Sequence, residues 1–238
     1  MGFMEEKELK TSAKQRIIIG AIAVILVGSF IASYAAIIIN GSKGKSGGDS
    51  GVDSEKIAAY QAVYEEKLAE FNELTKSDFD KFVAYRSEVK AYNETSANEG
   101  GLQTKDLLVG NGRTLKEGDT DYLAYYVGWC ADETVFDSSF DNASNPKAFN
   151  KALDASLGLI EGWNAGVVGM KLGGVRRLTI PGELAYGENM EICGGYNKPL
   201  RFLVMVVAKE DPLKTAAAAV DTAYMKWIYA QYGMEYGE

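Results

Sequence analysis

Hydrophobic and polar positions are arranged in three different ways along this chain. Residues 17–39 contain no charged side chain, so apolar residues run on almost continuously there. In residues 57–92 the apolar side chains recur every three or four positions, which is the spacing of one face of a helix. Residues 102–208 instead hold short alternating or fully apolar runs bounded by glycine, which are typical of strands. The pattern predicts an apolar N-terminal segment, a helical segment and a strand-rich domain.

The apolar run at 17–39 is predicted to be a transmembrane helix. At about 1.5 Å of rise per residue, it is long enough to cross a hydrocarbon core of about 30 Å. A cleaved secretory signal is the alternative, since Ser33-Tyr34-Ala35 offers small residues at the spacing of a cleavage site, but the apolar region of a signal covers only about 7–15 residues. More basic residues precede this run than follow it directly. This bias predicts a cytoplasmic tail at 1–16 and a single-pass anchor in the cell membrane, with the rest extracytoplasmic.

The chain then changes from a flexible to a helical pattern. Residues 40–52 are rich in glycine and serine, which predicts a flexible tether. In the helical segment 53–98, one apolar face is formed by Ile57, Tyr60, Tyr64, Leu68, Phe71 and Leu74. The period breaks at the polar residues 75–78, so the segment is either one kinked helix or two helices in a hairpin.

A C-terminal amphipathic helix is predicted at 212–238, where a run of alanines favours helix formation. Many of the tyrosines fall in the two flanking helical segments. These aromatic side chains either pack between the helices or onto the central domain, or they form a homo-dimer arm or a cradle for a client protein. The first interpretation is favoured, because an amphipathic stripe usually belongs to a core.

Composition excludes several kinds of chemistry. The net charge of −8 argues against nucleic acid as a partner, because phosphate contacts require clustered Lys and Arg. The chain has no histidine, which excludes Ser-His-Asp and Cys-His catalysis. Its two cysteines, Cys130 and Cys193, cannot fill the four-ligand shell of a zinc site, so no metal is expected. In an oxidising compartment they form a disulfide; two buried thiols are the alternative.

The central domain, 99–211, is predicted to be an antiparallel sheet with one short helix, within an α+β fold. Strands are expected at 102–108, 122–129, 134–138, 175–180 and 201–208. The last of them is apolar on both faces, which places it centrally in the sheet. Trp163, Val167 and Met170 share one helix face between two glycines, which predicts about two turns of helix against the sheet.

Three motifs in this domain occur together and in one order. They are VFDSS at 135–139, LIEGW at 159–163 and GMKLGGVRRLTIPGELAYG at 169–187. With these motifs, residues 101–210 resemble the FKBP-type peptidyl-prolyl cis-trans isomerases. The resemblance implies an antiparallel sheet wrapped on a short helix, and isomerisation of X–Pro bonds without a cofactor. The predicted clients are proline-containing proteins that are exported or displayed at the cell surface.

The resemblance also implies roles for individual residues. Trp163 would form the floor of an apolar pocket, and Asp137 would orient the pocket tyrosines or polarise the twisted amide. Tyr186 and the backbone N–H of Ile160 would bind substrate carbonyls. Other residues expected to contact the substrate are Tyr126, Phe136, Leu159 and Phe202. Either Phe149 or Leu153 would supply the remaining apolar wall, and the sequence leaves this choice open.

Two segments depart from the family pattern. Residues 138–159 are longer than is usual, and residues 188–199 lack the Ile-Pro-rich loop that normally follows the last motif. Since that loop would overhang the pocket, a rival hypothesis is a catalytically weak binding, chaperone or scaffold module in a cell-surface assembly.

Overall fold

The computed structural model describes residues 53–140 and 142–236. The predicted cytoplasmic tail, membrane anchor and tether, residues 1–52, therefore lie outside the described residues. Within these two ranges, no helix combines the length and the apolar character that crossing a membrane requires.

The described chain contains four α-helices, six strands and three short 3₁₀ turns. The helices are α2 (Ser54–Val83), α3 (Glu94–Glu99), α4 (Glu161–Gly166) and α5 (Leu213–Gln231). The strands are β1 (Gln103–Leu108), β2 (Tyr122–Trp129), β3 (Val135–Ser138), β4 (Leu153–Asp154), β5 (Val175–Ile180) and β6 (Leu200–Ala208). The 3₁₀ turns are η1 (Arg86–Glu88), η2 (Ala155–Leu157) and η3 (Gly182–Leu184).

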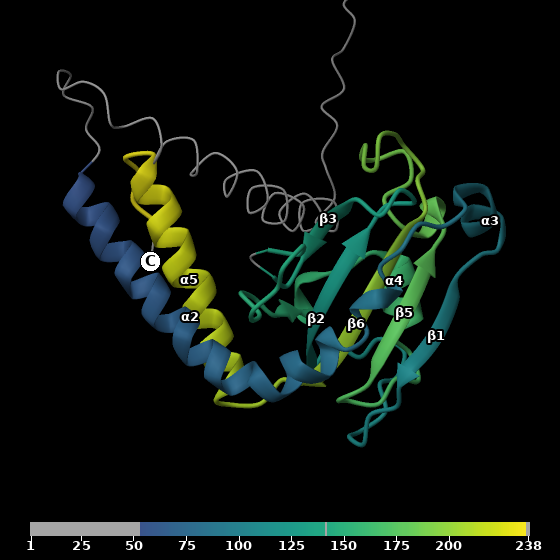
Figure 1. Cartoon of the computed structure of the whole chain (residues 1–238), viewed down its shortest axis with the longest axis horizontal. Helices are drawn as coiled ribbons and strands as arrows, with labels where there is room; N and C mark the ends of the chain where they lie inside the picture. The colour runs from purple at the N-terminus through teal and green to yellow at the C-terminus, as the bar shows by residue number, and fades with distance from the viewer. Residues whose placement is uncertain (1–52, 141, 237–238) are drawn as a thin grey trace, which may run out of the picture. The chain divides into compact units, whose positions relative to one another are not determined.

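The strands form one antiparallel sheet in the order β1-β5-β6-β2-β3, and the short β4 also pairs with β2 (Figure 1). Strand β6 lies between β5 and β2, as its apolar character on both faces predicted. Tyr126 of β2 is opposite Val204 of β6, and Arg176 of β5 is opposite the same residue. Because residues directly opposite each other share a face, this register divides the sheet into two faces.

Helix α2 is one helix that passes through residues 75–78, which decides between the two alternatives of one kinked helix and two helices in a hairpin. It is capped by Asp53, whose carboxylate accepts the backbone N–H groups of Glu55 and Lys56. The polar run does not interrupt it because Thr75 is buried and the apolar side chains on either side continue to pack. The helix ends at Val83, so the predicted apolar face stops earlier than residue 92. Leu74 is exposed and lies off that face.

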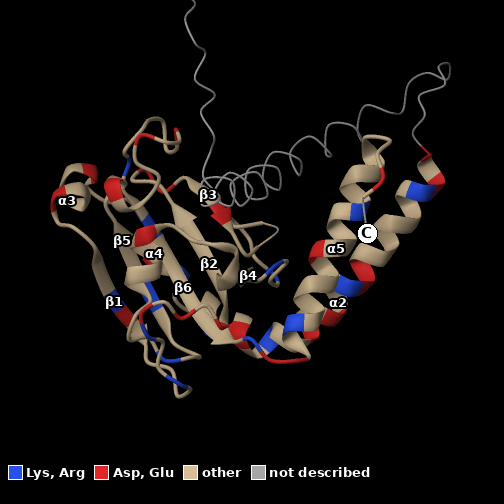
Figure 2. Ribbon diagram, turned by 180° about the vertical axis from the view of Figure 1, so that it is seen from behind, with Lys and Arg blue, Asp and Glu red and all other residues tan. Residues whose placement is uncertain are grey.

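Helices α2 and α5 run side by side (Figure 1), and α2 carries both signs of charge along its length (Figure 2). Between them, the ring of Tyr64 stacks on Trp227 with centroids 5.5 Å apart and contacts Tyr224 at the same distance. Further along α2, the side chains of Phe71 and Phe82 are buried in the core of the central domain. The flanking aromatic residues therefore pack both between the helices and onto the sheet.

The face of the sheet that helix α2 covers is here called the α2 face. Its core consists largely of aromatic side chains. Tyr125 of β2 stacks on Phe149 with ring centroids 3.9 Å apart, and Phe71 of α2 packs edge-on against Tyr125. Phe79 and Phe82 of α2 lie against Phe149 at 5.4 and 5.7 Å. The segment after β3 thus lies between the sheet and α2. Burying so many large aromatic side chains contributes much of the stability of this domain.

Candidate active site

The opposite face of the sheet, here called the α4 face, carries the short helix α4. The helix begins after Ile160, whose carbonyl accepts the N–H groups of Trp163 and Asn164. Glycine is required at position 162, because a Cβ there would lie 2.2 Å from Cγ2 of Ile180 in β5. Arg176 of β5 donates to the carbonyls of Gly166 and Val168 at 2.8 and 2.9 Å, which fixes the C-terminal end of α4. These contacts hold the indole of Trp163 against the sheet.

Four aromatic rings meet on this face in a chain of edge-on contacts. The indole of Trp163 lies 5.7 Å from the ring of Tyr126 and 5.3 Å from that of Phe202. Phe136 of β3 continues the chain, 5.6 Å from Phe202. At Gly128, a Cβ would approach Phe136 to 2.6 Å, so only glycine lets these two rings meet across β2. Residues that are far apart in the sequence thus form one apolar cluster.

The buried carboxylate of Asp137 lies beside this cluster with partners for both of its oxygens. Tyr126 donates its hydroxyl to Oδ2. Oδ1 accepts the Ser138 N–H at 2.8 Å and forms an ion pair with Nζ of Lys151 at 2.7 Å. A buried carboxylate is tolerated only when it is hydrogen-bonded and paired, and this one is both.

The tyrosine hydroxyls around the cluster are held in their protonated form. Burial, and next the charge of Asp137, raise the pKa of Tyr186 to about 12. Burial raises the pKa of Tyr126 well above its usual range, and Asp137 adds to this effect. Tyr122 accepts the indole N–H of Trp163 at 3.2 Å, and burial raises its pKa to about 12. These hydroxyl groups are therefore hydrogen-bond donors at neutral pH.

The sequence of the chain matches those of a known protein family. The family model for FKBP-type peptidyl-prolyl cis-trans isomerases matches residues 112–207. The FK506-binding protein of Neisseria meningitidis serogroup B is 38% identical over 111 residues, which cover 45% of this chain and 93% of that relative. The chain belongs to the FKBP-type peptidyl-prolyl cis-trans isomerase family.

Other relatives cover a similar share of the chain. FK506-binding protein 4 of Gibberella zeae is 44% identical over 89 residues, which cover 37% of this chain and only 17% of that protein. Among solved structures, AtFKBP13 is 31% identical, and the match covers 48% of this chain and 98% of that one with a TM-score of 0.36. The helical segment before the FKBP domain lies outside the residues matched by the family model.

The structure brings together most of the site residues that the sequence predicted. Tyr126, Phe136, Asp137, Trp163 and Phe202 form the cluster described above, and the charge of Asp137 contributes to the raised pKa of Tyr186. Leu159 and Ile160 are the two residues that directly precede α4. Within the described ranges, no group of three metal-ligating side chains is placed to hold a metal ion.

Phe149 does not belong to this cluster, which corrects one of the two alternatives for the remaining wall. It stacks on Tyr125 and packs against Phe140 and α2, so it lies on the α2 face. Leu153 of β4 pairs with Ala124, and Ala124 shares the α4 face with Tyr126. Alternation along a strand could not separate the two candidates, because Phe149 lies in the irregular segment before β4.

Lys151 is the site residue that the sequence interpretation missed. It lies in the long segment between β3 and β4, and its ammonium group is 5.6 Å from the ring centroid of Tyr126 as well as paired with Asp137. One signal could have found it: a carboxylate buried beside Phe136 needs a cationic or hydrogen-bonding partner, and this segment contains lysines.

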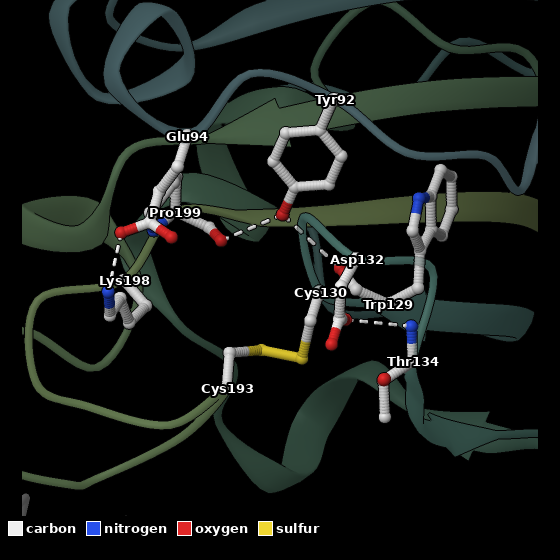
Figure 3. The surroundings of a disulfide bond; sticks show 9 residues. All are labelled: Tyr92, Glu94, Trp129, Cys130, Asp132, Thr134, Cys193, Lys198 and Pro199. Carbon is white, nitrogen blue, oxygen red and sulfur yellow. Dashed lines mark hydrogen bonds and ion pairs between the residues drawn. A yellow bond between two sulfur atoms is a disulfide. The ribbon is translucent and has the colours of Figure 1, made fainter.

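A disulfide joins Cys130, just after β2, to Cys193 in the loop after Tyr186 (Figure 3). The two Cα atoms are 5.5 Å apart. Near the bridge, Tyr92 donates its hydroxyl to the carbonyl of Pro199 at 2.8 Å, and Lys198 pairs with Glu94 at 2.6 Å. The loop that departs from the family pattern is thus tied to the sheet and to the segment before β1.

Proposed function

We propose that the FKBP domain isomerises X–Pro bonds of exported or cell-surface proteins at the cluster around Trp163. The observation that carries this proposal is the cluster in which Tyr126 joins Asp137 of the first motif to Trp163 of the second, while the charge of Asp137 also raises the pKa of Tyr186 of the third. Each aromatic residue alone would be ordinary core. Together they provide an apolar surface bordered by protonated hydroxyl groups and one neutralised carboxylate.

The mechanism that we propose lowers the rotation barrier without making or breaking a covalent bond. Rotation about an X–Pro amide has a barrier of about 18–20 kcal/mol because the planar amide is stabilised by resonance. The twisted amide has a less polar carbonyl, so an apolar surface at Trp163 and Phe202 favours it over the planar form. Tyr186 and the N–H of Ile160 would donate to the substrate carbonyls and hold the peptide in place.

Asp137 is proposed to act mainly through its neighbours. Both carboxylate oxygens are already engaged, by Tyr126 on one side and by Ser138 and Lys151 on the other. This supports the orienting role among the two roles implied by the resemblance. Lys151 offsets the negative charge, so that the cluster stays attractive to an uncharged proline ring.

The proposed location rests on the N-terminal sequence and on the disulfide. The apolar run at 17–39 and the basic residues before it support a single-pass anchor with the FKBP domain outside the cytoplasm. A disulfide is stable in an oxidising compartment, which agrees with this orientation. Protease added to cells whose outer barrier has been opened should cut the 40–52 tether and release the domain. Cleavage only after membrane lysis would contradict the orientation.

The activity itself is tested with the full chain in detergent and proline tetrapeptides that start in the cis form. Uncatalysed X–Pro isomerisation takes tens to hundreds of seconds, so catalysis appears as a faster relaxation that scales with protein concentration. We expect this acceleration. A protein that binds the peptides but leaves their relaxation unchanged would instead support the binding or scaffold module.

A further inference from the structure

The turn that carries Tyr186 is closed by hydrogen bonds at both of its ends. The carbonyl of Gly182 accepts the N–H groups of Ala185 and Gly187 at 3.1 and 2.9 Å. The carbonyl of Gly187 in turn accepts the N–H of Asn197 at 2.7 Å. Residues 182–187 are therefore fixed relative to residue 197, at the far end of the loop that follows them.

The side-chain amide of Asn98 completes this circuit from outside the turn. Its Oδ1 accepts the N–H of Gly182 at 2.8 Å, and its Nδ2 donates to the carbonyl of Asn197 at 3.3 Å. One residue thus uses both its acceptor and its donor to join the start of the turn to the end of the loop. The fit is close, because a Cβ at Gly182 would lie 2.1 Å from the carbonyl oxygen of Asn197.

Asn98 is itself held in place by the elements around it. It lies in α3, whose neighbouring residue Ala97 is buried and whose first turn is capped by Asn93. On the same side, Glu94 pairs with Lys198, next to the residue that Asn98 contacts (Figure 3). The segment between α2 and β1 therefore supports the loop over residues 187–199 at several points.

We propose that Asn98 is a positioning residue for the isomerase reaction, and that it acts by holding the turn that presents Tyr186. This inference rests on the proposed role of Tyr186 as a donor to the substrate. Asn98 lies outside residues 112–207, which the family model matches, so the segment that joins α2 to the FKBP domain completes the site. It takes over part of the support for a loop that lacks the usual family sequence.

The test is a double-mutant cycle between Asn98 and Tyr186 in the full chain, measured as kcat/KM on proline tetrapeptides. We expect Asn98→Leu to lower kcat/KM about three- to tenfold, which is the loss of a hydrogen bond or two at the site. In a Tyr186→Phe background, the same substitution should have little further effect, because residues that act through one group are not additive.

Two further variants separate positioning from a general loss of structure. Asn98→Asp keeps the acceptor for the Gly182 N–H but cannot donate to Asn197, so the amide exchange of Gly182 should stay slow in this variant and become fast in Asn98→Leu. Asp53→Ala is the control: it removes the side-chain cap of α2, which is not part of the Asn98 circuit, and lowers the melting temperature, while kcat/KM stays within about twofold of the parent.

The outcomes distinguish this inference from the proposed function. No turnover by the parent chain would overturn the proposed function and this inference with it. A second outcome would overturn the inference alone. In it, the parent has turnover and Tyr186→Phe lowers kcat/KM, but Asn98→Leu either leaves kcat/KM unchanged or lowers it by the same factor in both backgrounds. An unchanged exchange rate of Gly182 in Asn98→Leu would also contradict it.

Discussion

The two faces of the sheet use the same strand for different purposes. On the α2 face, Tyr125 stacks on Phe149, and its buried hydroxyl has no hydrogen-bond partner among the described residues. On the α4 face, the next residue, Tyr126, donates its hydroxyl to the carboxylate of Asp137. Both rings are almost fully buried. The difference lies in what surrounds them: one face contains aromatic carbon, the other aromatic carbon together with a charged pair.

This contrast shows where polar groups are placed in a domain that is apolar almost throughout. The α2 face gains its stability from the packing of rings supplied by the sheet, by the segment after β3 and by α2. The α4 face carries the short helix α4, and it keeps Asp137, Lys151 and protonated hydroxyl groups beside its rings. A core can tolerate such groups when each one is satisfied, and sites for ligands are built in this way.

The largest expected effects come from removing one ring from each face. Truncating a buried Phe or Trp to Ala typically costs about 3–5 kcal/mol, so both Phe71→Ala and Trp163→Ala should lower the free energy of unfolding strongly. Only Trp163→Ala should also lower kcat/KM of the remaining folded protein. Urea unfolding followed by the peptide assay measures both quantities, and an equal loss of kcat/KM in the two variants would remove the distinction between the faces.

Removing the disulfide, which ties the loop after Tyr186 to the end of β2, should have the next largest effect. A bridge with a sequence separation of 63 residues contributes roughly 2–4 kcal/mol by restricting the unfolded chain. Replacing both Cys130 and Cys193 by Ser should therefore lower the unfolding free energy by about that amount, as measured by denaturant titration. Two thiols that are alkylated in the native, unreduced parent would show that the bridge is absent.

The charged pair of the α4 face is tested by Asp137→Leu. We expect kcat/KM to fall about tenfold or more, because Tyr126 then loses its acceptor. The thermal melt should remain cooperative, since Lys151 is partly exposed and can be solvated. Lys151→Met keeps the length of the side chain and should cause a smaller loss. Full kcat/KM in a folded Asp137→Leu protein would show that the site is misassigned.

The smallest expected effect is that of pH on the hydroxyl groups. Because the pKa of Tyr186 is raised to about 12, its hydroxyl remains a donor and kcat/KM should change by less than about twofold between pH 7 and 10. Tyrosines in the unfolded chain titrate near 10, whereas Tyr122 and Tyr186 titrate at about 12 when folded. Stability present below pH 10 should thus be lost progressively from pH 10 to 12. An activity that falls near pH 9 would contradict these shifts.

Much of the central domain could be predicted from the sequence because its strands are short, apolar and bounded by glycine. Strands β2 and β5 have the predicted limits, and the site residues that lie in or beside regular elements, such as Tyr126 and Trp163, come together as expected. The choice between one helix and two at residues 75–78 stayed open in the sequence, because the local polar run favours a break there. Tertiary packing keeps α2 helical through it.

The positions of Phe149 and Lys151 could not be predicted for a different reason. Both lie in the irregular segment between β3 and β4, where neither period two nor period 3.6 assigns a side chain to a face. Asn98 was missed for a related reason. It belongs to a polar stretch that looks like a domain boundary, and only the folded chain brings its amide to Gly182 and Asn197.

The most direct test of the contrast between the faces compares Tyr125→Phe with Tyr126→Phe. The two substitutions remove the same hydroxyl group from adjacent residues that point to opposite faces. Tyr125→Phe should raise the free energy of unfolding by about 1 kcal/mol, because it removes an unsatisfied buried hydroxyl, and leave kcat/KM unchanged. Tyr126→Phe should lower the free energy of unfolding by about 1 kcal/mol and kcat/KM about three- to tenfold. If both substitutions have the same effect on kcat/KM, the isomerase site is not confined to the α4 face.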